Sequence, residues 1–186
     1  MNPDDAPAPP PVPDTPLARA VVEIEQHAAA SGWDQPAQLF ALVDTADLVR
    51  REPSLASLMG IDGTAGGLTA VQQEQLPSAE SLESALESIT WPAEVEGCAA
   101  VVERMVLPPE ADADIPADPA QAAAFAASHP ARQELRLVAG TTRDGATFCA
   151  MRFRAHDADQ LVVTGADLVP GLLELLQATL DPDPGR

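Results

Sequence analysis

Apolar residues recur every three or four positions in several stretches of the chain, as they do on the buried stripe of a helix. In the first such stretch, Leu17, Val21 and Ile24 fall on one stripe, with Thr15 as a good N-cap and Gly32 as a good helix end. Similar patterns, bounded by caps or prolines, predict further helices. The predicted helices are residues 15–32, 44–52, 78–89, 118–129 and a C-terminal helix that begins between 164 and 170 and ends at 180.

Between these helices, runs of apolar and β-branched residues bounded by glycine or proline predict strands. The runs are residues 37–43, 68–75, 98–107, 131–142, 146–156 and 160–163. The pattern in residues 68–75 is poor, so about four or five strands are expected.

The two runs on either side of Arg143-Asp144-Gly145 predict a β-hairpin, and the turn decides its register. A two-residue turn would mix charged and apolar side chains on each face. A three-residue loop with Gly145 in the left-handed conformation separates them, and the hydrophobic pattern therefore selects it. One face then pairs Ala139 with Cys149, Leu137 with Met151 and Leu135 with Phe153, and the other pairs Glu134 with Arg154 and Arg136 with Arg152.

Few strands read as apolar on both sides, which favours a sheet covered on one face only. The predicted fold class is α+β: a single domain with one antiparallel sheet and helices packed on one face. A mixed α/β layer is the alternative. The domain spans residues 15–181. Residues 1–14, rich in proline and aspartate, are expected to form a disordered tail, and residues 182–186 a C-terminal tail.

The chain has a formal net charge of -19, and all of its basic residues are arginine. Nucleic acid is excluded as a partner because phosphate binding draws its affinity from clustered basic residues. The absence of lysine excludes Schiff-base chemistry and the lysine of a phosphate-binding loop. The N-terminus lacks the pattern of a signal peptide, and no run reaches the ~18 apolar residues of a membrane helix. A cytoplasmic protein without membrane insertion is expected.

The common catalytic and metal-binding motifs have no match in the sequence, so neither a cofactor nor a metal is expected. Cys98 and Cys149 lie in apolar strands and are predicted to be buried free thiols. His156-Asp157-Ala158-Asp159 could ligate a cation, but this pattern is more typical of an exposed turn.

The arginines are distributed unevenly. Residues 131–155 hold five arginines against two acids, whereas residues 74–118 hold eleven acids against Arg104. In the hairpin register above, Arg136, Arg152 and Arg154 share the outward face, and Arg132 precedes it. These four arginines are the candidate binding residues, because guanidinium groups suit carboxylates and phosphates. The alternatives are an ordinary solvated sheet surface, or a face covered by the protein's own acidic loops.

Two classes of function follow. The first is a non-catalytic binding or adaptor module whose Arg-bearing face binds an acidic protein or an anionic ligand. The second is an enzyme whose site the sequence does not reveal, with His129, His156 and nearby acids as candidates. A deep pocket with convergent polar groups would favour the enzyme. The sequence leaves the oligomeric state open.

Four segments resemble an uncharacterised family of small acidic proteins from actinobacteria. They are GWDQPAQLFALV, VVERMVLPP, HPARQELRLVAGTTRDG and HDADQLVVTGADLVPGLLELL. The resemblance extends from Leu17 to Leu180. It implies an actinobacterial, cytosolic protein, and it supplies no catalytic or binding residues.

Overall fold

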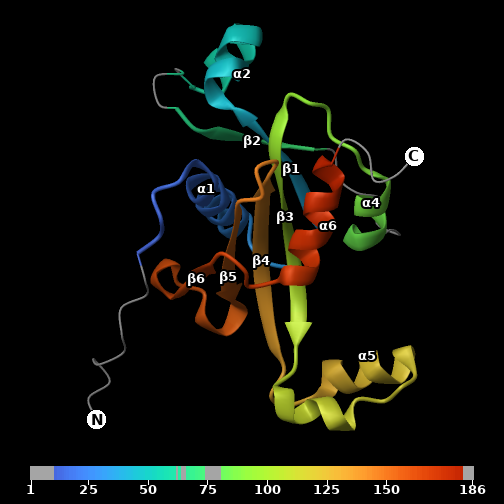
Figure 1. Ribbon diagram of the computed structural model, residues 1–186. Coiled ribbons are helices and arrows are strands. Elements are labelled where there is room, and N and C mark those ends of the chain that lie inside the picture. Colours follow the sequence, from blue (N-terminus) through green and yellow to red (C-terminus); the bar gives the residue numbers. More distant parts are fainter. Residues whose placement is uncertain (1–10, 62, 64–65, 74–80, 182–186) are drawn as a thin grey trace.

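An antiparallel sheet forms the centre of the protein in the computed structural model, which describes residues 11–61, 63, 66–73 and 81–181. Its six strands lie in the order β2-β1-β3-β4-β5-β6 (Figure 1). The strands are β1 (Gln38–Asp44), β2 (Leu68–Gln72), β3 (Val95–Val106), β4 (Gln133–Thr142), β5 (Thr147–Phe153) and β6 (Val163–Gly165). The sheet thus has more strands than the expected four or five, because two short strands, β2 and β6, form its edges.

The five predicted helices are present with some differences at their ends, and one further helix, α3, was not predicted. They are α1 (Pro16–Ala30), α2 (Thr45–Arg51), α3 (Pro53–Leu58), α4 (Leu82–Ser88), α5 (Pro119–Ser128) and α6 (Pro170–Leu180), with the 3-10 helices η1 (Pro109–Asp114), η2 (Arg154–His156) and η3 (Asp159–Leu161). The predicted helix 44–52 stops before Pro53, and Pro53 begins α3, since proline fits the first helical position. Ser81 caps α4, and the expected cap, Ser78, lies outside the described residues. No helix among the described residues is long and apolar enough to cross a membrane.

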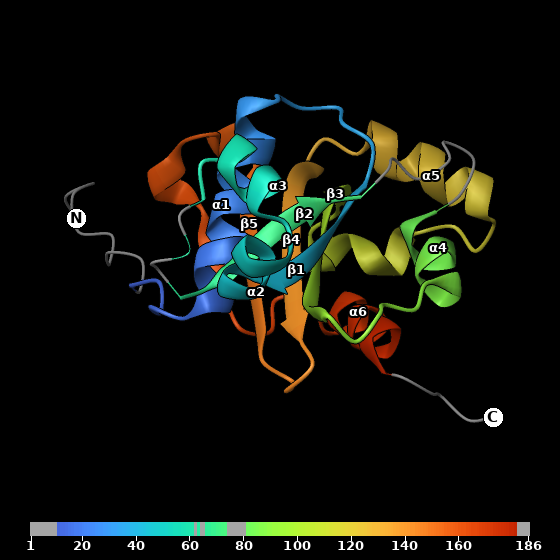
Figure 2. The ribbon, with the colours of Figure 1, turned by 90° about the horizontal axis from the view of Figure 1, so that it is seen from above.

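Helices cover both faces of the sheet, so the expectation of one covered face is wrong. Helix α1 packs on one face, and α4 and α6 pack on the other (Figure 2). The central strands are apolar on both sides: Leu39 and Ala41 belong to the core beneath α6, and Phe40 and Leu42 to the core beneath α1. Alanines on β3 and β5 hide this two-sided pattern in the sequence, because their small side chains are typical of both buried and exposed positions.

Gly140 on β4 sets how closely α1 approaches the sheet. A Cβ atom at this position would lie 2.7 Å from Cγ2 of Val21 and 3.2 Å from Cδ1 of Leu17. Contacts as short as the first do not occur between real side chains. The absence of a side chain at Gly140 therefore allows these two residues of α1 to pack directly on the strand.

The β4–β5 hairpin has the predicted register. Leu137 lies opposite Met151, and Arg136 opposite Arg152. Gly145 has a φ of +84° and donates its backbone N–H to the carbonyl of Thr142 at 2.9 Å. The turn chemistry read from the sequence is confirmed, but the face that carries the arginines does not point to solvent.

Candidate functional site

Arg136 and Arg152 lie side by side across β4 and β5, on the face that α1 covers. Val138 and Ala150, the next pair on the same face, belong to the core beneath α1. Only 1% and 2% of their surface is exposed. The expected outward orientation of these two residues is therefore wrong, because α1 and the loop that follows it lie over this end of the hairpin.

Arg152 forms the most deeply buried ion pair of the described residues. Its Nε and Nη2 atoms donate to the two carboxylate oxygens of Glu25 on α1, at 2.6 and 2.9 Å. The same guanidinium donates to Asp157 at 3.1 Å and to Asp159 at 2.8 Å. Hydrogen bonds to Glu25 in the first place, and then to the two aspartates, raise the pKa of Arg152 and keep it charged.

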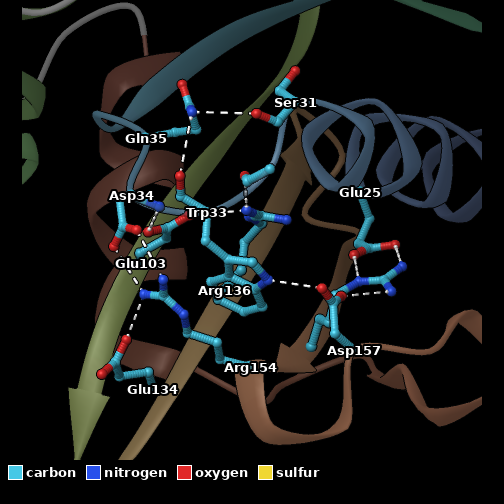
Figure 3. Close-up of polar contacts among 12 residues, drawn as sticks. Glu25, Ser31, Trp33, Asp34, Gln35, Glu103, Glu134, Arg136, Arg154 and Asp157 are labelled. Carbon is cyan, nitrogen blue, oxygen red and sulfur yellow. Dashed lines mark hydrogen bonds and ion pairs between the residues drawn. The ribbon is translucent and has the colours of Figure 1, made fainter.

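Trp33, just after α1, is the centre of the next group of contacts (Figure 3). The guanidinium carbon of Arg136 lies 4.4 Å from the centre of the indole ring, a cation–π distance. Arg136 also donates to Glu103 at 2.9 Å and to the carbonyl of Gly32. The indole Nε1 donates to Asp157 at 2.9 Å. Trp33 thus connects the loop after α1 to β4 and to the segment that follows β5.

Arg154 lies on the solvent side of Trp33 and forms ion pairs there. It donates to both carboxylate oxygens of Asp34 at 2.8 Å and to Glu134 at 2.7 Å. The hydrogen bond from Arg154 lowers the pKa of Asp34. Asp34 is in the left-handed conformation with a φ of 63°, and its backbone N–H donates to Glu103 at 2.8 Å. The guanidinium of Arg154 also lies 5.5 Å from the Trp33 ring centre.

Arg136, Arg152 and Arg154, here called the arginine cluster, are matched by the protein's own acids. Their partners are the carboxylates of Glu25, Asp34, Glu103, Glu134, Asp157 and Asp159. None of these acids comes from the acidic residues 110–118, so the carboxylates that cover the arginines belong to other parts of the chain. Arg132, the fourth candidate, is exposed and forms no salt bridge with a described residue.

One signal in the sequence pointed to this arrangement. Glu25 lies four residues after Val21 and three before Ala28, so it belongs to the apolar stripe of α1. A lone acid on such a stripe indicates a buried partner, because an unpaired buried charge is costly. Nothing in the sequence pattern singled out Trp33 or Asp34, and Asp157 was considered only as a possible ligand of a cation.

The remaining candidate side chains are not brought together. His129 accepts the backbone N–H of Ala131 at 3.1 Å and packs on Phe125, and His156 lies exposed in η2. Among the described residues, no three His, Cys, Asp or Glu side chains are placed to hold a metal ion. Cys98 and Cys149 are buried free thiols as predicted, and burial raises the pKa of Cys98 to about 11.

A large pocket lies at the opposite end of the sheet from Trp33, beside the N-terminus of α1; we call it the α1 pocket. It has a volume of about 780 Å³ and mostly apolar walls. Neighbouring strands run in opposite directions, so the ends of β1, β4 and β6 meet the starts of β2, β3 and β5 at this edge. The walls include Leu17, Leu68 and Phe148, and the segment before α1 adds Pro11 and Pro13.

Most charged side chains at the α1 pocket form hydrogen bonds with neighbouring residues of the protein. Asp44 accepts the backbone N–H of Asp47 and so caps α2. Asp144 accepts from the hydroxyl of Thr142 and the N–H of Ala146, and the first of these bonds lowers its pKa the most. Glu96 is exposed, and no described residue donates a hydrogen bond to its side chain.

A second groove of about 450 Å³ lies between α1 and the edge strand β2. Its lining includes Glu23, His27, Phe40 and Met59. It is smaller than the α1 pocket, and only β1 and β2 contribute to it, whereas all six strands contribute to the α1 pocket.

A model of a known protein family covers most of the chain. The family described as "PPA1309-like protein" matches residues 17–181. The chain belongs to this PPA1309-like family. No curated protein and no solved structure matches it.

The part of the chain that defines it as PPA1309-like contains every residue of the arginine cluster and all of its acidic partners. It also contains most of the α1 pocket, from Leu17 to Ala166. Only the rim formed by Pro11, Pro13, Thr15 and Pro16 precedes the match. Both features therefore belong to the domain that this PPA1309-like chain shares with its family.

Proposed function

We propose that this protein is a non-catalytic binding module and that the α1 pocket holds its ligand. The observation that carries the proposal is the pocket itself, about 780 Å³ with largely apolar walls. Small-molecule sites in proteins typically measure about 300–1,000 Å³ and combine apolar walls with a few polar groups. Residues at the ends of all six strands line the pocket, so the hydrogen-bonded sheet holds the lining residues in place.

The polar groups of the pocket support binding rather than chemistry. Thr15 caps α1, Asp44 caps α2 and Asp144 holds the hairpin turn, so these side chains fix the walls. General acid–base catalysis needs a group free to exchange a proton at the reacting atom. Neither His129 nor His156, the candidates of the enzyme alternative, lines the pocket.

An acidic or anionic partner bound through Arg132, Arg136, Arg152 and Arg154 stays a prediction. Two of these guanidinium groups are buried against carboxylates, so such a partner would meet only Arg132 and Arg154. The enzyme alternative also stays a prediction. An actinobacterial source and a cytoplasmic location, which the family resemblance implies, are part of this proposal.

The proposal is tested by recovering the ligand. The full-length protein is incubated with a small-molecule extract of its source cells, separated from unbound molecules by gel filtration, and denatured for mass spectrometry. We expect at least one compound to be enriched and to be recovered unchanged. A compound consumed during incubation would instead support the enzyme alternative.

Two variants locate the binding. Ala146→Trp and Ala166→Trp place an indole at exposed positions of the pocket wall and should abolish the enrichment. Ala123→Trp is the matched control, because it adds the same side chain at an exposed position on α5. No enriched compound, or equal enrichment by both pocket variants and the control, would show that the α1 pocket is not the ligand site.

A further inference from the structure

The rim of the α1 pocket is acidic, and its charges come from three different strand ends. Asp44 ends β1, Glu96 lies at the start of β3, and Asp144 lies in the turn after β4. The antiparallel order brings these three positions to one edge of the sheet. A bound molecule would therefore meet carboxylates from several sides.

Arg143 is the basic residue among those that line the pocket, and its guanidinium binds backbone carbonyls on the other face of the sheet. Arg143 contributes to the pocket wall, but its guanidinium donates to the carbonyls of Trp91, Pro92 and Val95 at 3.2, 2.9 and 2.8 Å, and to that of Leu180 at the end of α6. These carbonyls lie on the α6 side of the sheet. Outside the lining, Arg19 approaches Gly66 but is paired with Asp14. The rim thus keeps an excess of negative charge.

Beneath this rim, the walls are apolar. Leu17 and Phe148 belong to the core beneath α1 and reach the pocket, and prolines 11, 13 and 16 add further apolar surface. Each methylene group that such a wall removes from water improves affinity about fourfold. The walls therefore suit the hydrocarbon part of a ligand, while the rim suits a cation.

Resting on the proposed function, we infer that the α1 pocket selects an amphiphilic cation, a molecule with an apolar body and an ammonium or guanidinium head. The body contacts Leu17 and Phe148, and the head lies at the rim beside Glu96. Of the three acids, Glu96 has no described hydrogen-bond donor, so its carboxylate is available to the ligand. An anionic amphiphile of the same length would meet repulsion at the same place.

The inference is tested with three probes of equal chain length: hexylammonium, hexanol and hexanoate. Dissociation constants are measured by NMR titration of the labelled full-length protein at about 0.01 M and about 0.15 M salt. We expect hexylammonium to bind most tightly and hexanoate most weakly, with backbone signals of the pocket shifting. The advantage of hexylammonium should shrink at the higher salt, where the Debye length is about 8 Å.

Glu96→Gln isolates the rim charge. It should weaken hexylammonium about two- to fivefold, the range for a solvent-exposed ion pair, and leave hexanol unchanged. Glu87→Gln is the matched control, since it removes the same charge at an exposed position on α4. Octylammonium should bind more tightly than hexylammonium by about an order of magnitude, given two further methylenes.

The outcomes separate this inference from the proposed function. Equal binding of all three probes in the pocket, or an unchanged preference in Glu96→Gln, would overturn the cation preference and leave the pocket as a ligand site. Probes that fail to shift pocket signals, or that bind Ala146→Trp and the native protein equally, would also overturn the cation inference. Only the absence of an enriched compound from the cell extract as well would overturn both.

Discussion

At the scale of single residues, the buried side chains of the β4–β5 hairpin differ from those expected from the sequence. The predicted register made Phe153 a core residue and Arg152 a solvent-exposed one, so that the first would be costly to truncate and the second cheap. Phe153 is half-buried, whereas Arg152 is 2% exposed and bound to Glu25. The register is confirmed, and the expected exposure of Arg152 is wrong. From its burial we now expect truncation of Arg152 to be costly.

Arg152→Met should lower the free energy of unfolding by about 3–5 kcal/mol, because it leaves the Glu25 carboxylate buried without its partner. The double variant Glu25→Leu/Arg152→Met removes both charges and should recover most of this loss. Arg154→Met, at a side chain that is 39% exposed, should cost much less, because water and salt screen an exposed ion pair. Urea unfolding of the four proteins measures these values. Equal costs for the two single arginine variants would contradict the buried pair.

At the scale of elements, one glycine determines how α1 packs. Gly140 has no room for a side chain, since Val21 and Leu17 of α1 occupy the space above it. Gly171 in the first turn of α6 is the opposite case, with nothing within 4 Å of its would-be Cβ.

The pair Gly140→Ala and Gly171→Ala should therefore change stability in opposite directions. Gly140→Ala should destabilise by about 1–3 kcal/mol through overpacking against α1. Gly171→Ala should stabilise by up to about 1 kcal/mol, because alanine loses less backbone entropy in a helix. Thermal or urea unfolding gives both values. A neutral Gly140→Ala would mean that α1 can move away from β4 without loss.

The segment of η2 and η3 is held to Arg152 by its aspartates, which makes its attachment sensitive to acid. The indole N–H of Trp33, and then Arg152, lower the pKa of Asp157 below its usual range. A lowered pKa in the folded state means that Asp157 stabilises the protein above its unfolded pKa of about 3.9, and that this contribution is lost as the pH falls further.

Asp157→Asn should lower the free energy of unfolding at pH 7 by no more than about 1 kcal/mol, because the side chain is 46% exposed. The difference in free energy of unfolding between this variant and the native protein should shrink below about pH 4. Urea unfolding between about pH 7 and pH 3 measures it. In Trp33→Phe, which lacks the indole donor, an NMR titration should show a higher pKa for Asp157. A stability difference that does not vary with pH would contradict a lowered pKa of Asp157 in the folded protein.

At the scale of the whole molecule, the net charge of -19 opposes compaction. The arginine cluster offsets this repulsion locally, where three guanidinium groups face six carboxylates. Acids elsewhere, such as Glu87, Glu110 and Asp112, lie exposed and form no salt bridge with a described residue.

Added salt should therefore stabilise the protein. Raising NaCl from about 0.01 M to about 0.15 M shortens the Debye length from about 30 to about 8 Å and should raise the thermal midpoint by about 2–4 °C. A variant with Glu87, Glu110 and Asp112 changed to their amides should respond less. A midpoint that falls with salt would mean that the ion pairs outweigh the general repulsion.

The sequence by itself determined the local structure of this protein. The hairpin register followed from the turn glycine and the apolar alternation, both properties of adjacent residues. The start of α1 followed from Thr15 and Pro16, and burial of the two cysteines from their apolar strands.

Only the tertiary structure decided which faces meet other elements. Alternation tells that Arg136 and Arg152 share a face, but α1, which begins more than a hundred residues earlier, decides that this face is buried. The α1 pocket likewise depends on strand ends that are distant in the chain and adjacent only in the sheet.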